Sequence, residues 1–362
     1  MNTELTTIKS RKIFIDILRI LACFLVIVNH TNSQIFLSVT SVNDGIGISY
    51  ILSMAYFYFS KIAVPIFFMI SGALLLNKDY EIKDFIKKKL LRYLIILVLF
   101  SIIYYIYYNR NEDIWHIRNI LIFFKSIYST HITNSYWFLY SYLGILIMLP
   151  LIRKMVKNFN KNDYYYLFGI YIIIKSIFPI MEKILKIEGL SIFVSKMIFT
   201  ETVIYFILGH YLVNILKIKN KNRKKVVIIS CITLISYILA SCLYTIITLK
   251  KQGEYDLFFA DTDSIIRLLP ALSVFFIFNI IIEKLKISGK IQKIIIWISQ
   301  CTLGIYLLSD FIMQLTGKFY KNILSNNFQM IIAMIIWEIG IFSIGLVITS
   351  ILKKIPIIKK LL

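Results

Sequence analysis

Long apolar runs recur along the chain, separated by short polar stretches that carry most of its lysine and arginine residues. A helix needs about 17 to 25 apolar residues to cross roughly 30 Å of hydrocarbon, and the runs are close to that length. Barrel strands would instead alternate over about ten residues, a pattern that the chain lacks. The pattern predicts an all-α, polytopic membrane protein of about ten transmembrane helices, at about 13–32, 61–77, 93–108, 135–152, 164–180, 192–216, 226–249, 264–283, 294–315 and 328–352.

Two further apolar stretches lie outside these predicted spans. Residues 46–60 suit either a re-entrant piece or part of a long second helix. In residues 114–128 apolar side chains recur at helical spacing with polar ones between them, which predicts an amphipathic helix at the outer interface. No linker rich in glycine or serine divides the chain, so residues 1–362 are expected to form a single integral membrane domain.

Composition agrees with this picture, because 59% of the residues are hydrophobic and only 17% are charged. That is too apolar for a water-soluble core with a solvated shell. The four cysteines lie inside apolar runs without CxxC or Cys–His spacing, so the sequence predicts no metal site and no disulfide framework.

Basic residues are distributed unequally between the two sides of the predicted spans. Loops numbered alternately from the N-terminus hold 27 lysines and arginines in one set and 10 in the other. The positive-inside rule therefore predicts cytoplasmic termini and an even number of spans, as in a multi-pass protein of the bacterial inner membrane. The net charge of +22 reflects this bias and favours contact with anionic lipid. Because the basic residues are dispersed over short loops, nucleic acid is not an expected partner.

Some ionisable residues fall within or at the edges of the apolar runs. A charge there is costly and usually faces the protein interior or a hydrated cavity, so these positions mark where function is expected. Three of them, Lys175, Arg267 and Glu338, are expected to form internal ion pairs. The full set is Asp16, Arg19, Lys61, Lys175, Glu201, Arg267, Asp310 and Glu338.

The first predicted helix carries both a cation and a histidine. Arg19 and His30 are eleven residues apart, which places both on one helix face, about 16 Å apart along the axis. Asp16 lies on nearly the same stripe. Histidine is the side chain best suited to take a proton from a hydroxyl near neutral pH. The same spacing also suits a simple Asp16–Arg19 pair at the interface and a His30 that caps the helix end.

Five stretches in order along the chain carry a resemblance to a known family. The first is the helix with Arg19, ten intervening residues and His30, and the others are VPIFFMISGALLL at 64–76, FIKKKLLRYLIIL at 85–97, YWFLYSYLGILIMLPLI at 136–152 and SQCTLGIYLLS at 299–309. Together they resemble the acyltransferase-3 family of membrane O-acyltransferases, in which such an arginine and histidine mark the catalytic helix. The resemblance covers nearly the whole chain.

This resemblance implies an acyl donor and an acceptor. Acetyl-CoA or another acyl-CoA is expected to dock from the cytoplasm and to pass its acyl group to a hydroxyl of a cell-surface or lipid-linked glycan. Arg19, Lys61 and Arg92 are then expected to neutralise the CoA phosphates at the inner mouth. Ser71 and Gly72 are expected to let the backbone approach the pantetheine arm, although a packing role suits Gly72 equally well.

The resemblance also implies the catalytic residues. His30 is expected to act as the general base or as a transient carrier of the acyl group. Glu201 matches an acidic position of the family and is expected to orient His30 or the acceptor, and Asp16 completes the predicted catalytic set.

On the acceptor side, Trp137 with Tyr136 and Tyr140 is expected to form a platform for the sugar or the thioester. An interfacial belt of aromatic residues is the alternative for these three.

The chain departs from the family pattern at two places. Relatives often have histidine where Ser135 and Ser309 stand here, and the neighbouring Asp310 is a candidate to substitute at the second place. The main rival function is a transporter or flippase of a lipid-linked glycan, which would also need buried charges and a hydrated path.

Overall fold

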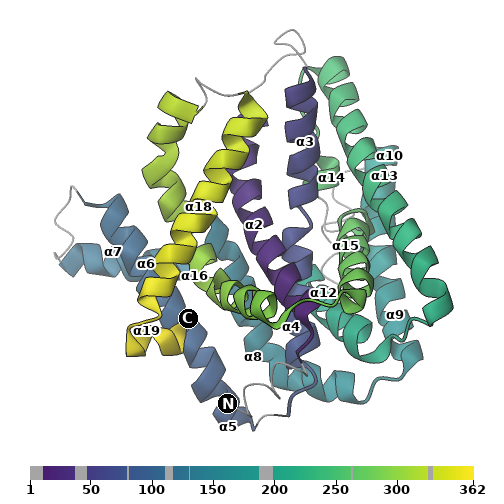
Figure 1. Cartoon of the computed structure of the whole chain (residues 1–362), viewed down its shortest axis with the longest axis horizontal. Helices are drawn as coiled ribbons and strands as arrows, with labels where there is room; N and C mark the ends of the chain where they lie inside the picture. Colours follow the sequence, from purple (N-terminus) through teal and green to yellow (C-terminus); the bar gives the residue numbers. More distant parts are fainter. Residues whose placement is uncertain are drawn as a thin grey trace.

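The computed structural model describes residues 11–36, 47–79, 81–110, 117–129, 131–186, 199–261, 264–324 and 329–362, and within these ranges it is helical without any strand (Figure 1). The α-helices are α2 (Ile13–Phe36), α3 (Ile48–Ser60), α4 (Ala63–Leu75), α5 (Ile82–Phe85), α6 (Leu91–Tyr108), α7 (Ile117–Ser129), α8 (Trp137–Lys157), α9 (Lys161–Ile172), α10 (Phe178–Leu185), α12 (Glu201–His210), α13 (Asn220–Gln252), α14 (Phe258–Asp261), α15 (Ile265–Lys284), α16 (Gly289–Phe319), α18 (Met330–Leu352) and α19 (Pro356–Leu361). Shorter turns continue or join them: the 3₁₀ turn η3 (Asn134–Tyr136) and the π-helical segments η2 (Ile86–Leu90), η4 (Ile173–Ile177), η6 (Tyr211–Ile215) and η7 (Tyr320–Leu324).

Eight helices in the described ranges are long and apolar enough to cross a membrane. They cover every predicted span except 164–180 and 192–216. Both exceptions are helical where they are described, because α9, η4 and α10 run through the first, and the shorter apolar helix Glu201–Ile215 occupies the second from residue 201 on. A polytopic all-helical membrane protein is therefore confirmed, while the count of ten and the location of the termini stay predictions.

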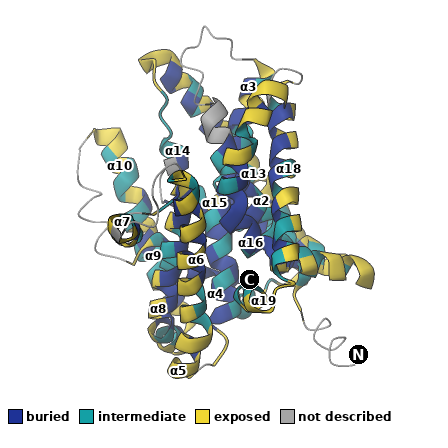
Figure 2. Ribbon diagram, turned by 90° about the vertical axis from the view of Figure 1, so that its left-hand side faces the viewer, coloured by how far each residue is buried: buried dark blue, intermediate teal, exposed yellow. Residues whose placement is uncertain are grey.

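The first helix, α2, lies inside the bundle and packs against α3, α4, α15, α16 and α18 (Figure 1). Leu18, Ala22 and Ile27 on it are completely buried. Figure 2 shows the buried residues gathered along the middle helices and the exposed ones on the outside. A helix that is enclosed on most sides holds its few polar side chains in fixed positions, so α2 is the structural axis of the candidate site.

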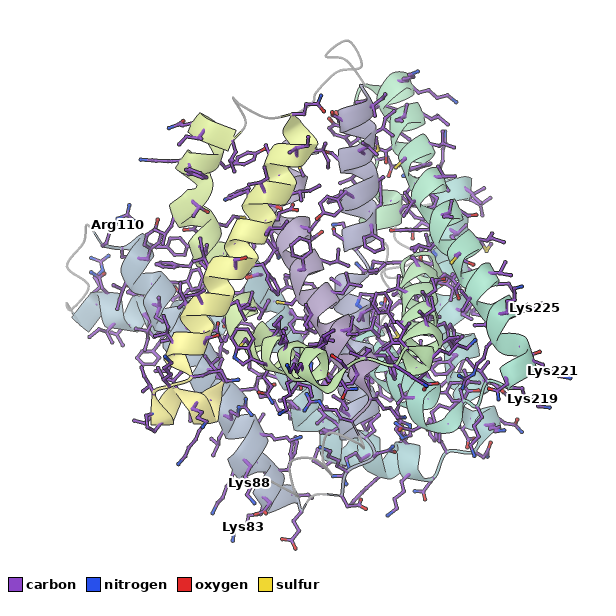
Figure 3. The ribbon with its side chains drawn as sticks, in the orientation of Figure 1. Lys83, Lys88, Arg110, Lys219, Lys221 and Lys225 are labelled. Atoms are coloured by element: carbon purple, nitrogen blue, oxygen red, sulfur yellow. The ribbon has the colours of Figure 1, made fainter. Side chains whose placement is uncertain are left out.

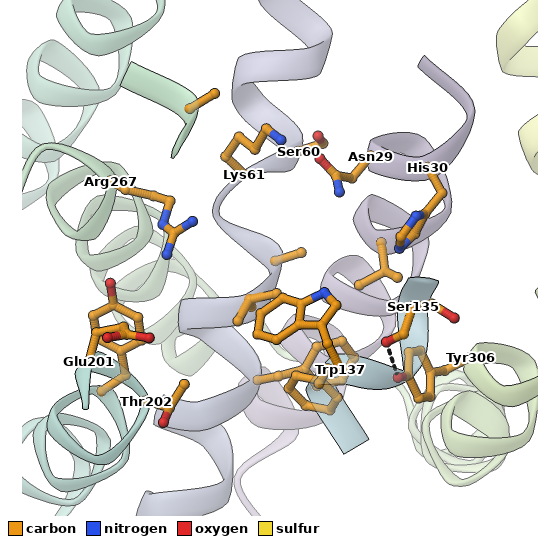
Figure 4. A pocket seen from close by; sticks show the side chains of 17 residues that line it. Asn29, His30, Ser60, Lys61, Ser135, Trp137, Glu201, Thr202, Arg267 and Tyr306 are labelled. Atoms are coloured by element: carbon orange, nitrogen blue, oxygen red, sulfur yellow. Dashed lines mark hydrogen bonds between the residues drawn. The ribbon is translucent and has the colours of Figure 1, made fainter. Parts of the chain in front are cut away.

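The apolar stretch before the second span is part of a long interrupted helix. α3 ends at Ser60 and α4 begins at Ala63, with a turn at Lys61 and Ile62 between them. Pro65 explains the break, because its ring has no N–H to donate and clashes with the carbonyl four residues earlier, that of Lys61. Of the two predicted forms for 46–60, the long second helix is therefore correct from residue 47 on. The break leaves Ser60 and Lys61 pointing into a cavity (Figure 4).

Glycines let α4 and α12 touch through their backbones. A Cβ atom added at Gly72 would lie 1.7 Å from the carbonyl oxygen of Phe206, and one at Gly209 would lie 1.8 Å from that of Met69. Small residues at helix crossings allow such close packing in membrane proteins. Gly72 therefore has the packing role that was one of its two predicted roles, and it does not line the cavities described below.

The predicted amphipathic helix is α7, and residues 114–116 lie outside the described residues. Its Leu121 is 64% exposed, while Phe123 is buried against Tyr105. The Tyr105 hydroxyl donates to the Asn119 carbonyl at 2.7 Å, which fixes α7 to the end of α6.

Basic residues of the richer loop set gather toward one end of the bundle. Lys83, Lys88 and Lys219 lie in the lower half of Figure 3, whereas Arg110, from the poorer set, lies higher. Which side of the membrane this end faces stays a prediction.

Candidate active site

A cavity of about 360 Å³ lies where the break between α3 and α4 faces the C-terminal half of α2. We call it the histidine chamber. Figure 4 shows His30 and Ser135 on one side, Arg267 and Glu201 on the other, and Trp137 between them. Its polar and aromatic lining is Asn29, His30, Ser60, Lys61, Ser135, Trp137, Phe138, Glu201, Thr202, Tyr205, Arg267 and Tyr306.

His30 faces this chamber, and its ring makes no hydrogen bond to any residue that the structure describes. α2 continues to Phe36, so His30 does not cap a helix end and that alternative reading is wrong. The charged groups that interact electrostatically with the ring are Asp310 and Lys61.

Asp310 is a buried carboxylate on α16 that holds the segment before α8. Its Oδ2 atom accepts hydrogen bonds from the hydroxyls of Thr133 and Ser135, both at 2.6 Å. The Tyr306 hydroxyl, one turn earlier on α16, donates to the Ser135 carbonyl at 2.6 Å. Ser135, which stands at one departure from the family pattern, thus bonds Asp310, the candidate substitute at the other, and Ser135 lines the same chamber as His30.

On the opposite wall, Glu201 forms an ion pair with Lys175 at 3.5 Å. This confirms the internal ion pair predicted for Lys175. Glu201 lies across the chamber from His30 (Figure 4), so it does not orient the imidazole, and only its predicted role toward the acceptor remains open. Arg267 lines the same wall, where its guanidinium faces into the chamber (Figure 4).

A second cavity, of about 520 Å³, lies at the N-terminal half of α2, and we call it the arginine chamber. Four cations line it, from α2, α6 and the segment after α18: Arg19, Arg92, Lys353 and Lys359. No acidic residue is among its described lining residues. Ser71, Tyr93 and Tyr142 supply hydroxyl groups. The chamber therefore suits a ligand with several negative charges.

Two of these cations are held in place by polar contacts within the protein. Arg19 Nη1 lies 3.9 Å from Asp16 Oδ1 and 3.3 Å from Ser299 Oγ. Arg92 donates from Nε to the Leu361 carbonyl at 2.8 Å. Both guanidinium groups keep further N–H donors for a ligand.

Asp16 does not belong to the histidine chamber. It accepts hydrogen bonds from Arg11 Nη2 at 2.6 Å and from Ser299 Oγ at 2.7 Å, and the bond with Arg11 raises the pKa of the Arg11 guanidinium. Along α2 it lies about 21 Å from His30. The predicted Asp16–Arg19 pair is therefore present, and the structure groups Asp16 with Arg19 rather than with the catalytic histidine.

Aromatic side chains separate the two chambers. Phe67, Phe138 and Tyr306 line both of them. The ring of Phe138 lies 5.6 Å from Phe67 and 5.6 Å from Tyr306, measured between centroids. We call these three residues the aromatic partition. The partition therefore lies between the chamber of Arg19 and the chamber of His30.

Lys61 is not where the sequence placed it. It lines the histidine chamber and lies 4.2 Å over the ring of Phe57, whereas the prediction grouped it with Arg19 and Arg92 at the inner mouth. The helix break at Lys61 explains the difference, because the turn directs this side chain into the chamber.

The predicted aromatic platform is reduced to one residue. Trp137 is 41% exposed and lines the histidine chamber. Tyr136 is fully buried and donates to the Leu307 carbonyl at 3.1 Å, and Tyr140 donates to the Ile127 carbonyl of α7 at 2.8 Å. These two tyrosines hold helices together instead of lining the chamber.

Glu338 has hydroxyl partners in place of the predicted ion pair. It is completely buried on α18 and accepts from Thr31 Oγ1 at 2.6 Å and from the Tyr56 hydroxyl at 2.9 Å. No salt bridge to it occurs among the described residues.

Several residues that line the chambers were not singled out from the sequence. Side chains with a hydroxyl or amide group, and lysines near the C-terminus, carry no signal of periodicity or motif. These residues are Asn29, Ser60, Thr202 and Tyr205 in the histidine chamber and Tyr93, Tyr142, Lys353 and Lys359 in the arginine chamber.

Within the described ranges, no group of three or more His, Cys, Asp or Glu side chains is arranged to hold a metal ion.

A histidine open to substrate in one chamber and a cluster of cations in the adjoining one are features of a membrane-embedded group-transfer enzyme. The chain belongs to the acyltransferase-3 family, whose model, described as an acyltransferase domain, matches residues 12–354. It is therefore an acyltransferase. Comparison with curated proteins and with solved structures gives no significant match.

Proposed function

We propose that this enzyme transfers an acyl group, most simply acetyl, from cytoplasmic acyl-CoA to a hydroxyl of a cell-surface or lipid-linked glycan. The observation that carries the proposal is that one buried helix, α2, contributes side chains to both chambers. Arg19 of α2 faces the cationic chamber and His30 of α2 faces the other, with the aromatic partition between them.

In this proposal the arginine chamber holds the phosphates of the donor. A CoA molecule carries several phosphate charges, and the four cations of this chamber match them without a competing lining acid. Arg19 and Arg92 supply fixed guanidinium groups. The pantetheine arm then extends along Ser71 and past the aromatic partition, which delivers the thioester to the histidine chamber.

The chemistry in the histidine chamber is general base catalysis. His30 takes the proton of the acceptor hydroxyl while its oxygen attacks the thioester carbonyl carbon. The resulting oxyanion lies in a chamber that contains the cationic groups of Lys61 and Arg267, which stabilise negative charge there. The carbon–sulfur bond then breaks, the ester leaves with the acceptor, and the CoA thiolate receives the proton from His30.

The acceptor is assigned to the chamber wall opposite His30. Trp137 offers a half-exposed aromatic face for a sugar ring, and Glu201 offers a carboxylate for sugar hydroxyls. The order of the sequence motifs resembles that of the enterobacterial common antigen O-acetyltransferase, and this resemblance supports a glycan acceptor. We accordingly assign the protein to the bacterial inner membrane, with both termini cytoplasmic and with residues 1–362 as one integral domain.

Transport of a lipid-linked glycan is the competing function. The interrupted helix α3–α4 is a feature that transporters also use. Membership of an acyltransferase family and a base directed into a closed chamber favour the enzyme.

The proposal is tested by transfer of radiolabelled acetyl groups to the glycan fraction of cells that carry each variant at matched membrane abundance. His30→Ala is expected to lower glycan labelling by about 10²- to 10⁴-fold, the usual contribution of a general base. His30→Gln is not expected to restore it, because an amide cannot take up the proton. His131→Ala, which changes an exposed histidine outside both chambers, is the matched control and is expected to label normally.

Near wild-type labelling with His30→Ala would contradict the mechanism. Labelling that is absent from the glycan fraction but present in another membrane fraction would contradict the acceptor class alone.

A further inference from the structure

A third cavity, of about 750 Å³, lies apart from both chambers, between the C-terminal end of α8, the loop after α4 and the end of α12. It shares no lining residue with the histidine chamber or the arginine chamber. The family chemistry derived above makes no use of it.

Cations dominate the charged lining of this cavity. Lys12, Arg153, Lys154 and Lys157 line it together with one acid, Asp79. The Arg153 side chain is only 13% exposed and lies 2.9 Å from Asp79, whose own side chain is 89% exposed. The guanidinium is thus fixed within the cavity, while its carboxylate partner stands at the rim in solvent. The excess of positive charge suits an anionic ligand.

One wall of the cavity is a fixed polar network. His210 is buried at the end of α12, with Nε2 2.8 Å from Asn77 Oδ1 and Nδ1 3.1 Å from the Tyr164 hydroxyl. Since an amide oxygen can only accept, His210 donates from Nε2 and its Nδ1 accepts from Tyr164. This orientation leaves the Asn77 amide N–H groups for other acceptors. Rigid polar walls distinguish this cavity from a solvated patch of lysines.

The cavity continues into a surface that suits lipid chains. On α8, Ile147 is 60% exposed and Leu151 is 59% exposed. Both lie on the same helix face as Lys154, at spacings of seven and three residues. A molecule whose anionic group lies among Arg153, Lys154 and Lys157 can therefore lay an apolar chain along Ile147 and Leu151. Soluble anions gain nothing from that stripe.

We propose that this cavity binds the phosphodiester headgroup of an anionic glycerophospholipid, with Arg153 and Lys157 as its principal cations. Basic pockets between membrane helices at the lysine-rich face are typical sites for such headgroups. The shared chemistry is that of a phosphate ester, so free phosphate and the phosphates of CoA are the competing sources. The inference is independent of the proposed glycan acceptor.

The test measures lipid binding to the full chain by native mass spectrometry, with dioleoyl phosphatidylglycerol titrated against dioleoyl phosphatidylcholine. The pocket variant combines Arg153→Gln with Lys157→Gln. Its matched control combines Lys221→Gln with Lys225→Gln, which removes two exposed lysines of α13 that line none of the three cavities (Figure 3). Arg153→Lys keeps the charge and shows whether loss of binding in the pocket variant follows charge or misfolding.

Wild-type protein is expected to prefer phosphatidylglycerol. Each removed cation is expected to cost about fivefold in affinity for it, hence about 25-fold for the pocket variant, with little change in the control. Equal loss in both double variants would overturn the proposal, since it would reflect net charge only. Displacement of the lipid by millimolar inorganic phosphate, or by CoA together with a raised KM for acyl-CoA in the pocket variant, would also overturn it.

Discussion

The two chambers of this enzyme differ in charge, although one helix contributes to both. The arginine chamber is lined by four cations and no described acid, whereas the histidine chamber combines Lys61 and Arg267 with Glu201. The first arrangement suits a polyanion that must be held. The second suits a neutral sugar and a charge that develops only during reaction. Their separation by Phe67, Phe138 and Tyr306 implies that binding and chemistry can be altered independently.

The largest effect on donor binding is expected from Arg19. Arg19→Ala should weaken acyl-CoA binding by about 30-fold or more, because it removes a charge that is partly desolvated and paired with phosphate. Lys61→Ala should leave donor affinity unchanged, because Lys61 lines the other chamber. Equilibrium binding of acetyl-CoA to purified protein in nanodiscs measures both. Equal weakening by the two variants would mean that the chambers do not divide donor binding in this way.

A smaller effect is expected from Asp310→Asn. The amide keeps an oxygen for Thr133 or Ser135 but loses the charge that acts on His30 and strengthens those bonds. A loss of about 1.5 kcal/mol corresponds to about tenfold in kcat. Donor affinity should not change, because Asp310 lies outside the arginine chamber. Steady-state kinetics with the pH profile of kcat separates this positioning role from a general loss of folded protein.

The partition is expected to limit the length of the acyl group. Phe138→Ala removes the ring that lies between the chambers, so kcat/KM for butyryl-CoA should rise relative to acetyl-CoA by about tenfold, the worth of one or two methylene groups in a pocket. Phe123→Ala changes a buried ring outside the partition and serves as the control for lost packing. An unchanged ratio in Phe138→Ala would show that these rings do not select the acyl chain.

The smallest effect on transfer is expected at Glu338, which lines neither chamber. Glu338→Gln weakens the hydrogen bonds from Thr31 and Tyr56 and should destabilise the protein by about 1–3 kcal/mol. Transfer per folded molecule should stay close to wild type. Thermal unfolding and activity, measured on the same preparation, test this. A large loss of kcat without a loss of stability would contradict this prediction and would show that Glu338 takes part in catalysis.

The sequence predicted those features of the fold and site that depend on the length and spacing of apolar residues. Apolar length and helical spacing placed the spans and put Arg19 and His30 on one buried helix. The sequence did not predict side-chain positions that depend on a local break in a helix or on a contact between two helices. Lys61 changes chamber because Pro65 interrupts the helix. For Gly72 the sequence left two roles open, and the crossing of α4 and α12 at Phe206 selects the packing role. The hydropathy of the sequence shows neither where α4 crosses α12 nor the direction in which the break between α3 and α4 turns the Lys61 side chain.

Residues that join distant segments were also beyond the sequence. Asp310 and Ser135 are 175 positions apart and meet through a hydrogen bond. Lys353 and Lys359 enter the arginine chamber only because the segment after α18 folds back onto α6, where Arg92 contacts Leu361. Buried charge marked Arg267 and Asp310 as sites of interest, but it could not say which partners they face.

The central claim is that α2 binds the donor at one end and performs the chemistry at the other. The most direct measurement determines acetyl-CoA affinity and single-turnover transfer on one preparation of His30→Ala. Affinity should stay close to wild type, since Arg19 lies about 16 Å away along the helix, while transfer falls by at least about 10²-fold. A parallel loss of affinity, or transfer near the wild-type rate, would contradict the division of binding and catalysis between the two chambers.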